Sequence, residues 1–127
     1  MNHNNYAFVS GRLAKDPQVL ENKDRYKNVR VVVAAQDNLK NSKGERGTQF
    51  ITLERFYNKG QEIKGVLETS KTGDAVSFMY EVRNNNYTDK DGNAVYDYSF
   101  LIQSAQYAES KSAADARHAK AEEVAEV

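Results

Sequence analysis

The chain has 127 residues, of which 39% are hydrophobic and 28% charged, so it suits one globular domain and is too apolar for a disordered chain. It has no cysteine and only two histidines, which argues against thiol chemistry, a zinc site and a Ser-His-Asp triad. The net charge is zero, but residues 1–108 carry +2 and residues 109–127 carry −2. A polyanionic ligand is compatible with this balance without being required by it.

The N-terminal residues have neither the basic region nor the apolar region of a signal peptide. No apolar run approaches the ~18 residues of a membrane-spanning helix. We therefore expect a cytoplasmic protein.

Alternation of apolar and polar residues predicts a chain dominated by β-strands. Their Val, Ile, Tyr and Phe content suits a half-buried pleated surface. Five runs carry this pattern: residues 6–13, 26–36, 49–57, 75–87 and 94–107.

The connections between these runs add to the prediction. Residues 37–48 are polar and contain glycine, which indicates a long loop. Residues 59–67 carry Ile63, Val66 and Leu67 at helical spacing and predict a short helix, closed by a turn at residues 72–74. The Asp-Gly pair at residues 91–92 predicts a hairpin turn. An all-β chain of five strands with one short helix between the third and fourth has the element order of an OB-fold barrel.

The composition changes after residue 108, where alanine and charged residues dominate. We divide the chain into a barrel domain, residues 1–108, and an acidic Ala-rich tail, residues 109–127. One interpretation of the tail is a frayed or loosely docked helix, with a thin apolar face of Ala113, Ala116, Ala119 and Val124. The other is an acidic segment that recruits partners.

The third run offers two exposed aromatic rings if its alternate residues face the core and the solvent as we expect. Ile51 and Leu53 are the natural inward residues of a small barrel, which turns Phe50 and Phe56 outward. Exposed rings on one face suit base stacking. The reversed parity, with both Phe residues in the core, stays open.

The fourth run becomes polar after residue 82, which predicts an exposed arm. Tyr87 lies on this arm near Arg83 and Lys90, an arrangement that suits single-strand binding through stacking and phosphate neutralisation. The alternative is that Tyr87 only stiffens the hairpin by pairing with Tyr96 or Val95.

No catalytic site is expected. Residues 89–92 lack the closing Glu of a calcium loop, and residues 44–47 lack the Gly-Lys-Ser/Thr of a P-loop. We expect His3 and His118 to be solvated. The chain is therefore predicted to be no enzyme, with no metal and no cofactor.

Several motifs resemble bacterial-type single-stranded DNA-binding proteins, in order and at similar spacing. They are residues 5–17 (NYAFVSGRLAKDP), 31–35 (VVVAA), 48–51 (TQFI) with Phe56, 72–76 (TGDAV) and 87–92 (YTDKDG). The resemblance covers roughly residues 5–107. The compact chain and its divergent end suggest a phage- or plasmid-encoded member.

The resemblance implies that bases stack on Phe50, Phe56 and Tyr87. It implies backbone contacts from scattered basic residues, for which the candidates are Arg12, Arg30, Lys40, Lys43, Lys59, Arg83 and Lys90; Arg55 shares the inward parity of Ile51 and Leu53. The chain has Leu39 where the family has a further aromatic residue, and it has no tryptophan. Both departures favour weaker or differently organised binding.

The resemblance also implies homo-oligomers, dimers or tetramers. The chain ends in an acidic tip without the family's Pro-Phe pair, so recruitment of replication or recombination proteins is either absent or uses another partner.

The leading hypothesis is a non-catalytic protein that coats and protects single-stranded DNA during replication, recombination or repair. The alternative is an OB-fold protein-interaction module, such as a primosome-like accessory subunit, with weak DNA binding. An RNA-binding variant of the fold is a third hypothesis.

Overall fold

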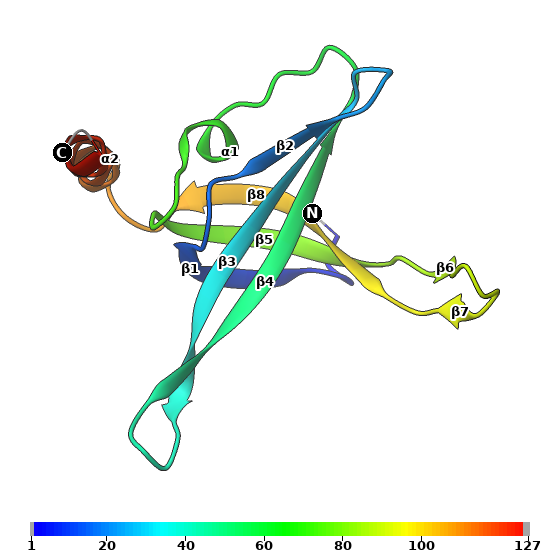
Figure 1. Ribbon diagram of the computed structural model, residues 1–127, viewed down its shortest axis with the longest axis horizontal. Coiled ribbons are helices and arrows are strands. Elements are labelled where there is room, and N and C mark those ends of the chain that lie inside the picture. The colour runs from blue at the N-terminus through cyan, green and yellow to red at the C-terminus, as the bar shows by residue number, and fades with distance from the viewer. Residues whose placement is uncertain (1, 126–127) are drawn as a thin grey trace.

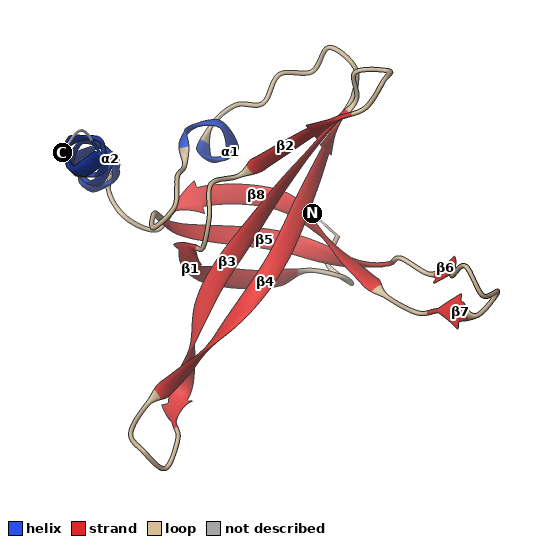
Figure 2. Ribbon diagram, in the orientation of Figure 1, coloured by secondary structure: helices blue, strands red, loops and turns tan. Residues whose placement is uncertain are grey.

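The computed structural model describes residues 2–125 (Figures 1 and 2). Its elements follow the order β1 (Ala7–Leu13), β2 (Gln18–Glu21), β3 (Lys27–Lys40), β4 (Arg46–Tyr57), α1 (Val66–Thr69), β5 (Ala75–Asn84), β6 (Tyr87–Thr88), β7 (Ala94–Val95), β8 (Tyr98–Tyr107) and α2 (Lys111–Ala125). Among these residues, neither helix is both long and apolar enough to cross a membrane.

Five strands form a closed barrel in the order β1-β5-β8-β4-β3, and a pairing of β1 with β3 closes the ring. Strand β2 pairs with β3. All pairings are antiparallel except that of β4 with β8. The all-β architecture agrees with the OB-fold prediction.

The strength of strand pairing varies around the barrel. Strands β3 and β4 pair along most of their length, from Lys27–Tyr57 to Gln36–Thr48, with an irregularity before Lys40. Strands β4 and β8 are in register only at Glu54 and Leu101. The barrel therefore has a sparsely bonded seam between β4 and β8, and its β1–β3 closure, with two registered pairs, is also short.

The inward faces of the strands form the core. Leu53 and Phe78 are fully buried at its centre, as expected for the alternate positions of strands that turn one face inward. The remaining members are Val9, Leu13, Val29, Val31, Val33, Tyr57, Leu67, Val76 and Ile102. At the β1–β3 contact, a Cβ on Gly11 would lie 2.2 Å from the carbonyl oxygen of Ala34. Glycine is therefore needed where the barrel closes.

The long loop predicted over residues 37–48 is wrong. Strand β3 continues to Lys40 and β4 begins at Arg46, so only five residues connect them. The Asn41 side chain accepts hydrogen bonds from the Lys43 and Glu45 backbone amides, and Gly44 has φ of 78°. The polar residues thus form a tight hairpin turn and two exposed strand ends.

The helix predicted over residues 59–67, between the third and fourth strands, is not found in that form. Residues 58–65 are loop and turn, and a helix of four residues, α1, lies after β4. Gly60 and Gly65 have φ of 81° and 74°, which no helix accommodates. Strand β2 was not predicted, because all four of its residues are exposed and give no alternation.

The fourth and fifth runs each divide into two strands, and the short pair β6–β7 forms an arm that projects from the barrel (Figure 1). The predicted turn at its tip is present. Gly92 has φ of 82°, and the Asp89 carboxylate accepts the backbone amides of Asp91 and Asn93.

Helix α2 packs against the barrel end opposite the arm (Figure 1). Asp74, which is fully buried, accepts hydrogen bonds from Arg117 at 3.1 Å and lies 2.8 Å from His118 Nε2. Arg117 also donates two hydrogen bonds to Glu109, which lowers the pKa of that carboxyl to about 2. We name Asp74, Glu109, Arg117 and His118 the α2 anchor.

The α2 anchor corrects two expectations. His118 is not solvated, because only 18% of its side chain is exposed. The buried alanine of the helix is Ala114 at 1% exposure, whereas Ala113, Ala116 and Ala119 are exposed. The expected thin apolar face is therefore wrong at its three alanines, and the side chain of Val124, its fourth member, lies outside the described part of the chain. Residues 126–127 of the acidic tip lie outside the described residues.

Candidate nucleic-acid interface

The outer face of β3 and β4 carries an aromatic ring at each end. Phe50 and Phe56 are 67% and 61% exposed, while Leu53 between them is fully buried. The strand therefore has the parity that turns both Phe rings outward. Across the ladder Phe50 pairs with Ala34 and Phe56 pairs with Asn28.

The β6–β7 arm adds a third exposed ring. Tyr87 pairs with Val95, as the stiffening alternative expected, yet 54% of Tyr87 stays exposed. The two interpretations of Tyr87 are therefore compatible, because the residue is paired with Val95 in the strand register and still offers an open ring.

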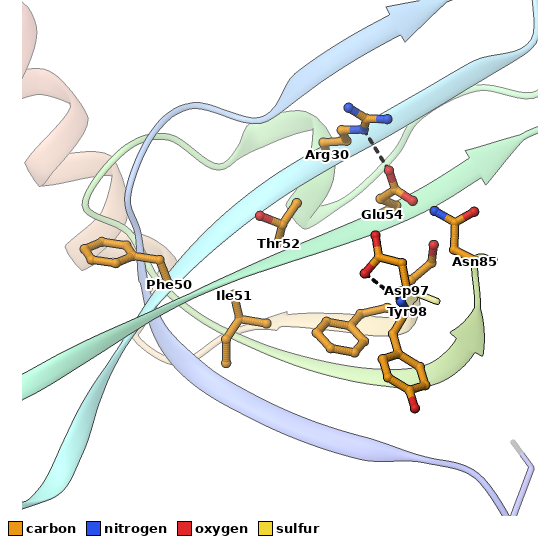
Figure 3. A pocket seen from close by; sticks show the side chains of 10 residues that line it. Arg30, Phe50, Ile51, Thr52, Glu54, Asn85, Asp97 and Tyr98 are labelled. Atoms are coloured by element: carbon orange, nitrogen blue, oxygen red, sulfur yellow. Dashed lines mark hydrogen bonds and ion pairs between the residues drawn. The ribbon is translucent and has the colours of Figure 1, made fainter. Parts of the chain in front are cut away.

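Between the β4 face and the base of the arm lies an open hollow of about 370 Å³. Its lining comes from β3, β4, β8 and the segments next to them. Figure 3 shows Phe50 at one side and Asp97 and Tyr98 at the other. The lining residues are Arg30, Phe50, Ile51, Thr52, Glu54, Asn85, Asp97, Tyr98, Ser99 and Phe100.

Three of the predicted backbone-contact arginines already have partners within the chain. Arg30 Nε lies 2.7 Å from Glu54 Oε1, and Arg83 Nε lies 2.9 Å from Glu81 Oε1. Arg12 donates to the carbonyl oxygen of Gly73 at 2.8 Å, and its charge is one of those that lower the pKa of the Glu109 carboxyl. Carboxylates thus offset the charges of Arg30 and Arg83.

Arg12 lies in line with one stacking candidate. It pairs with Ala34, and Ala34 pairs with Phe50, so Arg12 and Phe50 are two strand spacings apart, about 10 Å. Both side chains are exposed.

The predicted lysines are exposed at the edges of this face. Lys40 and Lys43 lie at the β3–β4 turn, Lys59 follows the end of β4, and Lys90 lies at the tip of the arm. The structure does not gather these lysines into one cluster.

Sequence reasoning missed the aromatic residues that follow the arm. Tyr96 and Tyr98 are 80% and 64% exposed, and Tyr98 lines the hollow. It also missed Glu54 and Asp97, the carboxylates of the hollow. The sequence contained a signal for Glu54, because this residue shares the outward parity of Phe50. It contained none for Asp97, because the position of Asp97 beside β4 depends on how β4 and β8 pair.

The model of the single-strand binding protein family matches residues 4–108. Single-stranded DNA-binding protein 2 of Staphylococcus aureus strain Mu50 is 26% identical over 107 residues, which are 84% of this chain and 74% of that protein. Single-stranded DNA-binding protein 1 of the same strain is 24% identical over 111 residues, 87% of this chain and 69% of that protein. The chain belongs to the single-strand binding protein family.

Proposed function

We propose that the chain is a non-catalytic protein that binds and coats single-stranded DNA, with residues 1–108 as the binding domain. The observation that carries this proposal is the outward pair Phe50 and Phe56 on one strand face, beside an arm that bears Tyr87. The family and the S. aureus relatives, which are named as single-stranded DNA-binding proteins, support the same ligand.

Exposed rings have a physical role on such a face. Large apolar side chains that stay in water cost free energy unless a partner covers them. Base stacking on an aromatic ring contributes about 1–3 kcal/mol per base and tolerates any sequence. Arg12, Lys40, Lys43, Lys59 and Lys90 are the proposed phosphate contacts, while Arg30 and Arg83 contribute less because Glu54 and Glu81 offset their charges.

The distance between Phe50 and Phe56 sets the length of single-stranded DNA that can contact both rings. Phe50 and Phe56 are six residues apart on a strand, about 20 Å at ~3.3 Å per residue. Stacked nucleotides advance about 3.4 Å each, so the two rings cannot hold adjacent bases of one stack. We therefore expect the bases on these two rings to lie about six nucleotide steps apart along a stacked strand, and oligonucleotides too short to span that distance to lose one ring.

Self-association is part of the proposal. Residues 7–10 of β1 pair with β5 on one side, and the β1–β3 pairing begins only at Arg12. The other edge of this half-strand is thus open beside Tyr6 and Phe8, which are 55% and 63% exposed. A second copy is the proposed occupant of this edge, in a dimer or tetramer. Native mass spectrometry measures the assembly.

The test is a titration of labelled single-stranded DNA at low and high salt, with duplex DNA and RNA of equal length as competitors. Tight, salt-sensitive and single-strand-selective binding is expected. The absence of binding at low salt would reject the proposed function and favour the protein-interaction module.

The ring assignment has its own control at the same position. Phe56→Ala should weaken binding by about 5- to 150-fold, the equivalent of one lost stacking contact. Phe56→Tyr keeps the ring and should bind nearly as tightly as the original chain. Equal loss in both variants, or loss in neither, would reject Phe56 as a stacking residue.

A further inference from the structure

We propose that the hollow between Phe50 and Tyr98 is a nucleobase pocket that favours bases with an exocyclic amino group, with Asp97 and Glu54 as the selecting residues. This inference rests on the proposed function, because it concerns which base the single strand presents at this place. It predicts that cytosine is preferred to thymine in the pocket.

The charge of the hollow excludes phosphate. Its charged lining residues are Arg30, Glu54 and Asp97, two carboxylates against one guanidinium. Since Arg30 is paired with Glu54 at 2.7 Å, the uncompensated charge is negative. A phosphate is repelled there, so a strand that crosses the hollow turns a base inward and its backbone outward.

The walls offer a base two aromatic surfaces. Phe50 on β4 and Tyr98 on β8 are 67% and 64% exposed. Figure 3 shows Phe50 and Tyr98 at opposite sides of the hollow. Ile51 and Phe100 also line it and contribute apolar surface. A flat apolar ligand with a polar edge fits this combination better than a sugar or a phosphate does.

Each carboxylate of the hollow has one oxygen engaged by the chain. Asp97 Oδ1 accepts the Tyr98 backbone amide at 2.8 Å. Glu54 Oε1 accepts from Arg30 and from Asn28 Nδ2. Within residues 2–125, no hydrogen bond reaches Asp97 Oδ2 or Glu54 Oε2. Two acceptor atoms therefore remain for a ligand.

The backbone of Asp97 is fixed on both sides. Its carbonyl oxygen accepts the Asn85 amide at 2.8 Å, and its amide donates to Asn86 Oδ1 at 3.3 Å. The carboxylate is thus held at the base of the arm, which lowers the entropy cost of making a directed contact.

The chemistry of the free atoms decides the preference. An ionised carboxylate only accepts hydrogen bonds. Cytosine offers a donating amino group at N4, where thymine has the acceptor O4. Cytosine and thymine have the same ring size, so the carboxylate distinguishes them by one contact, which is a hydrogen bond with cytosine and a repulsion between two acceptors with thymine.

The substitution Asp97→Asn tests this directly, because it replaces a hydrogen-bond acceptor by a donor at the same place. The amide oxygen of asparagine can keep the bond to the Tyr98 amide, while the atom that replaces Oδ2 becomes an N–H donor. The measurement is the ratio of dissociation constants for oligo-dT and oligo-dC of equal length, by anisotropy at pH 8. We expect Asp97→Asn to shift this ratio toward oligo-dT by at least about 5-fold. Asp91→Asn, at the tip of the arm, is the control with the same charge change and should leave the ratio unchanged.

The outcomes separate the two proposals. Failure of the original chain to bind either oligonucleotide would reject the proposed function. Binding of both with a ratio that Asp97→Asn does not change would reject only the selective pocket. If circular dichroism reveals that Asp97→Asn is unfolded, Glu54→Gln replaces it with the same readout and the same expected direction.

Discussion

The α2 anchor gives the sharpest stability prediction, through the substitution Arg117→Ala. Arg117 joins the helix to a buried carboxylate, Asp74, and to Glu109 in the segment before the helix. Removal of Asp74 itself would be less informative, because Asp74 also accepts the Lys71 backbone amide and closes the turn before β5. Arg117 is the cleaner perturbation.

The magnitude follows from the contacts that are lost. Arg117 donates two hydrogen bonds to Glu109 and one to Asp74, which is fully buried. Hydrogen bonds to charged groups contribute about 1.5–3 kcal/mol each, and the 33% exposure of the Arg117 side chain reduces this through solvent screening. With His118 still beside Asp74, we expect the free energy of α2 docking to fall by about 2 kcal/mol, or roughly 30-fold in the equilibrium constant.

Hydrogen exchange followed by mass spectrometry measures this docking locally. Amides of α2 should exchange roughly 30-fold faster in Arg117→Ala, while those of β3 and β4 keep their protection. Lys120→Ala removes a positive charge from an exposed position on the same helix and should change little. Equal exchange of α2 in the two variants would refute the anchor as the source of docking.

Two further predictions concern the stability of the protein at acid pH and the closure of the barrel. Arg117 holds the folded pKa of Glu109 at about 2, below its ordinary 4.5, so its contribution to stability is complete above pH 4.5 and is lost as the pH falls toward 2. Thermal melts between pH 5 and pH 2 should therefore depend less on pH in Glu109→Gln, and identical profiles would contradict this. Gly11→Ala places a Cβ 2.2 Å from a backbone oxygen of β3 and should cost about 1–3 kcal/mol of unfolding free energy. A urea midpoint equal to that of the original chain would contradict the close approach.

The barrel strands were predictable because their inward positions are large and apolar while neighbouring positions are polar. The parity of β4 was harder, since both of its faces carry apolar residues. The decisive feature is that Leu53 and Tyr57 share the inward face while Glu54 shares the outward face with both Phe residues. Charge did not decide the parity, because Arg55 lies on the inward face just as Glu54 lies on the outward one.

Other features depend on contacts between distant residues. Asp74 and Arg117 are 43 positions apart, and no pattern around either residue indicates the other. Strand β2 is exposed at every position and is held by backbone pairing to β3, which leaves no hydropathy signal. The candidate stacking residues were named from one strand and one hairpin, whereas the hollow needed the register of β8 against β4.

The seam between β4 and β8 has a mechanical consequence for the hollow. The pair in register across this seam is Glu54 and Leu101. Glu54 lines the hollow, and so does Phe100, the residue before Leu101. Few backbone hydrogen bonds resist separation of the two strands there, while the long β3–β4 ladder resists bending. The floor of the hollow therefore lies at a seam where separating the two strands breaks fewer backbone hydrogen bonds than it would along the β3–β4 ladder.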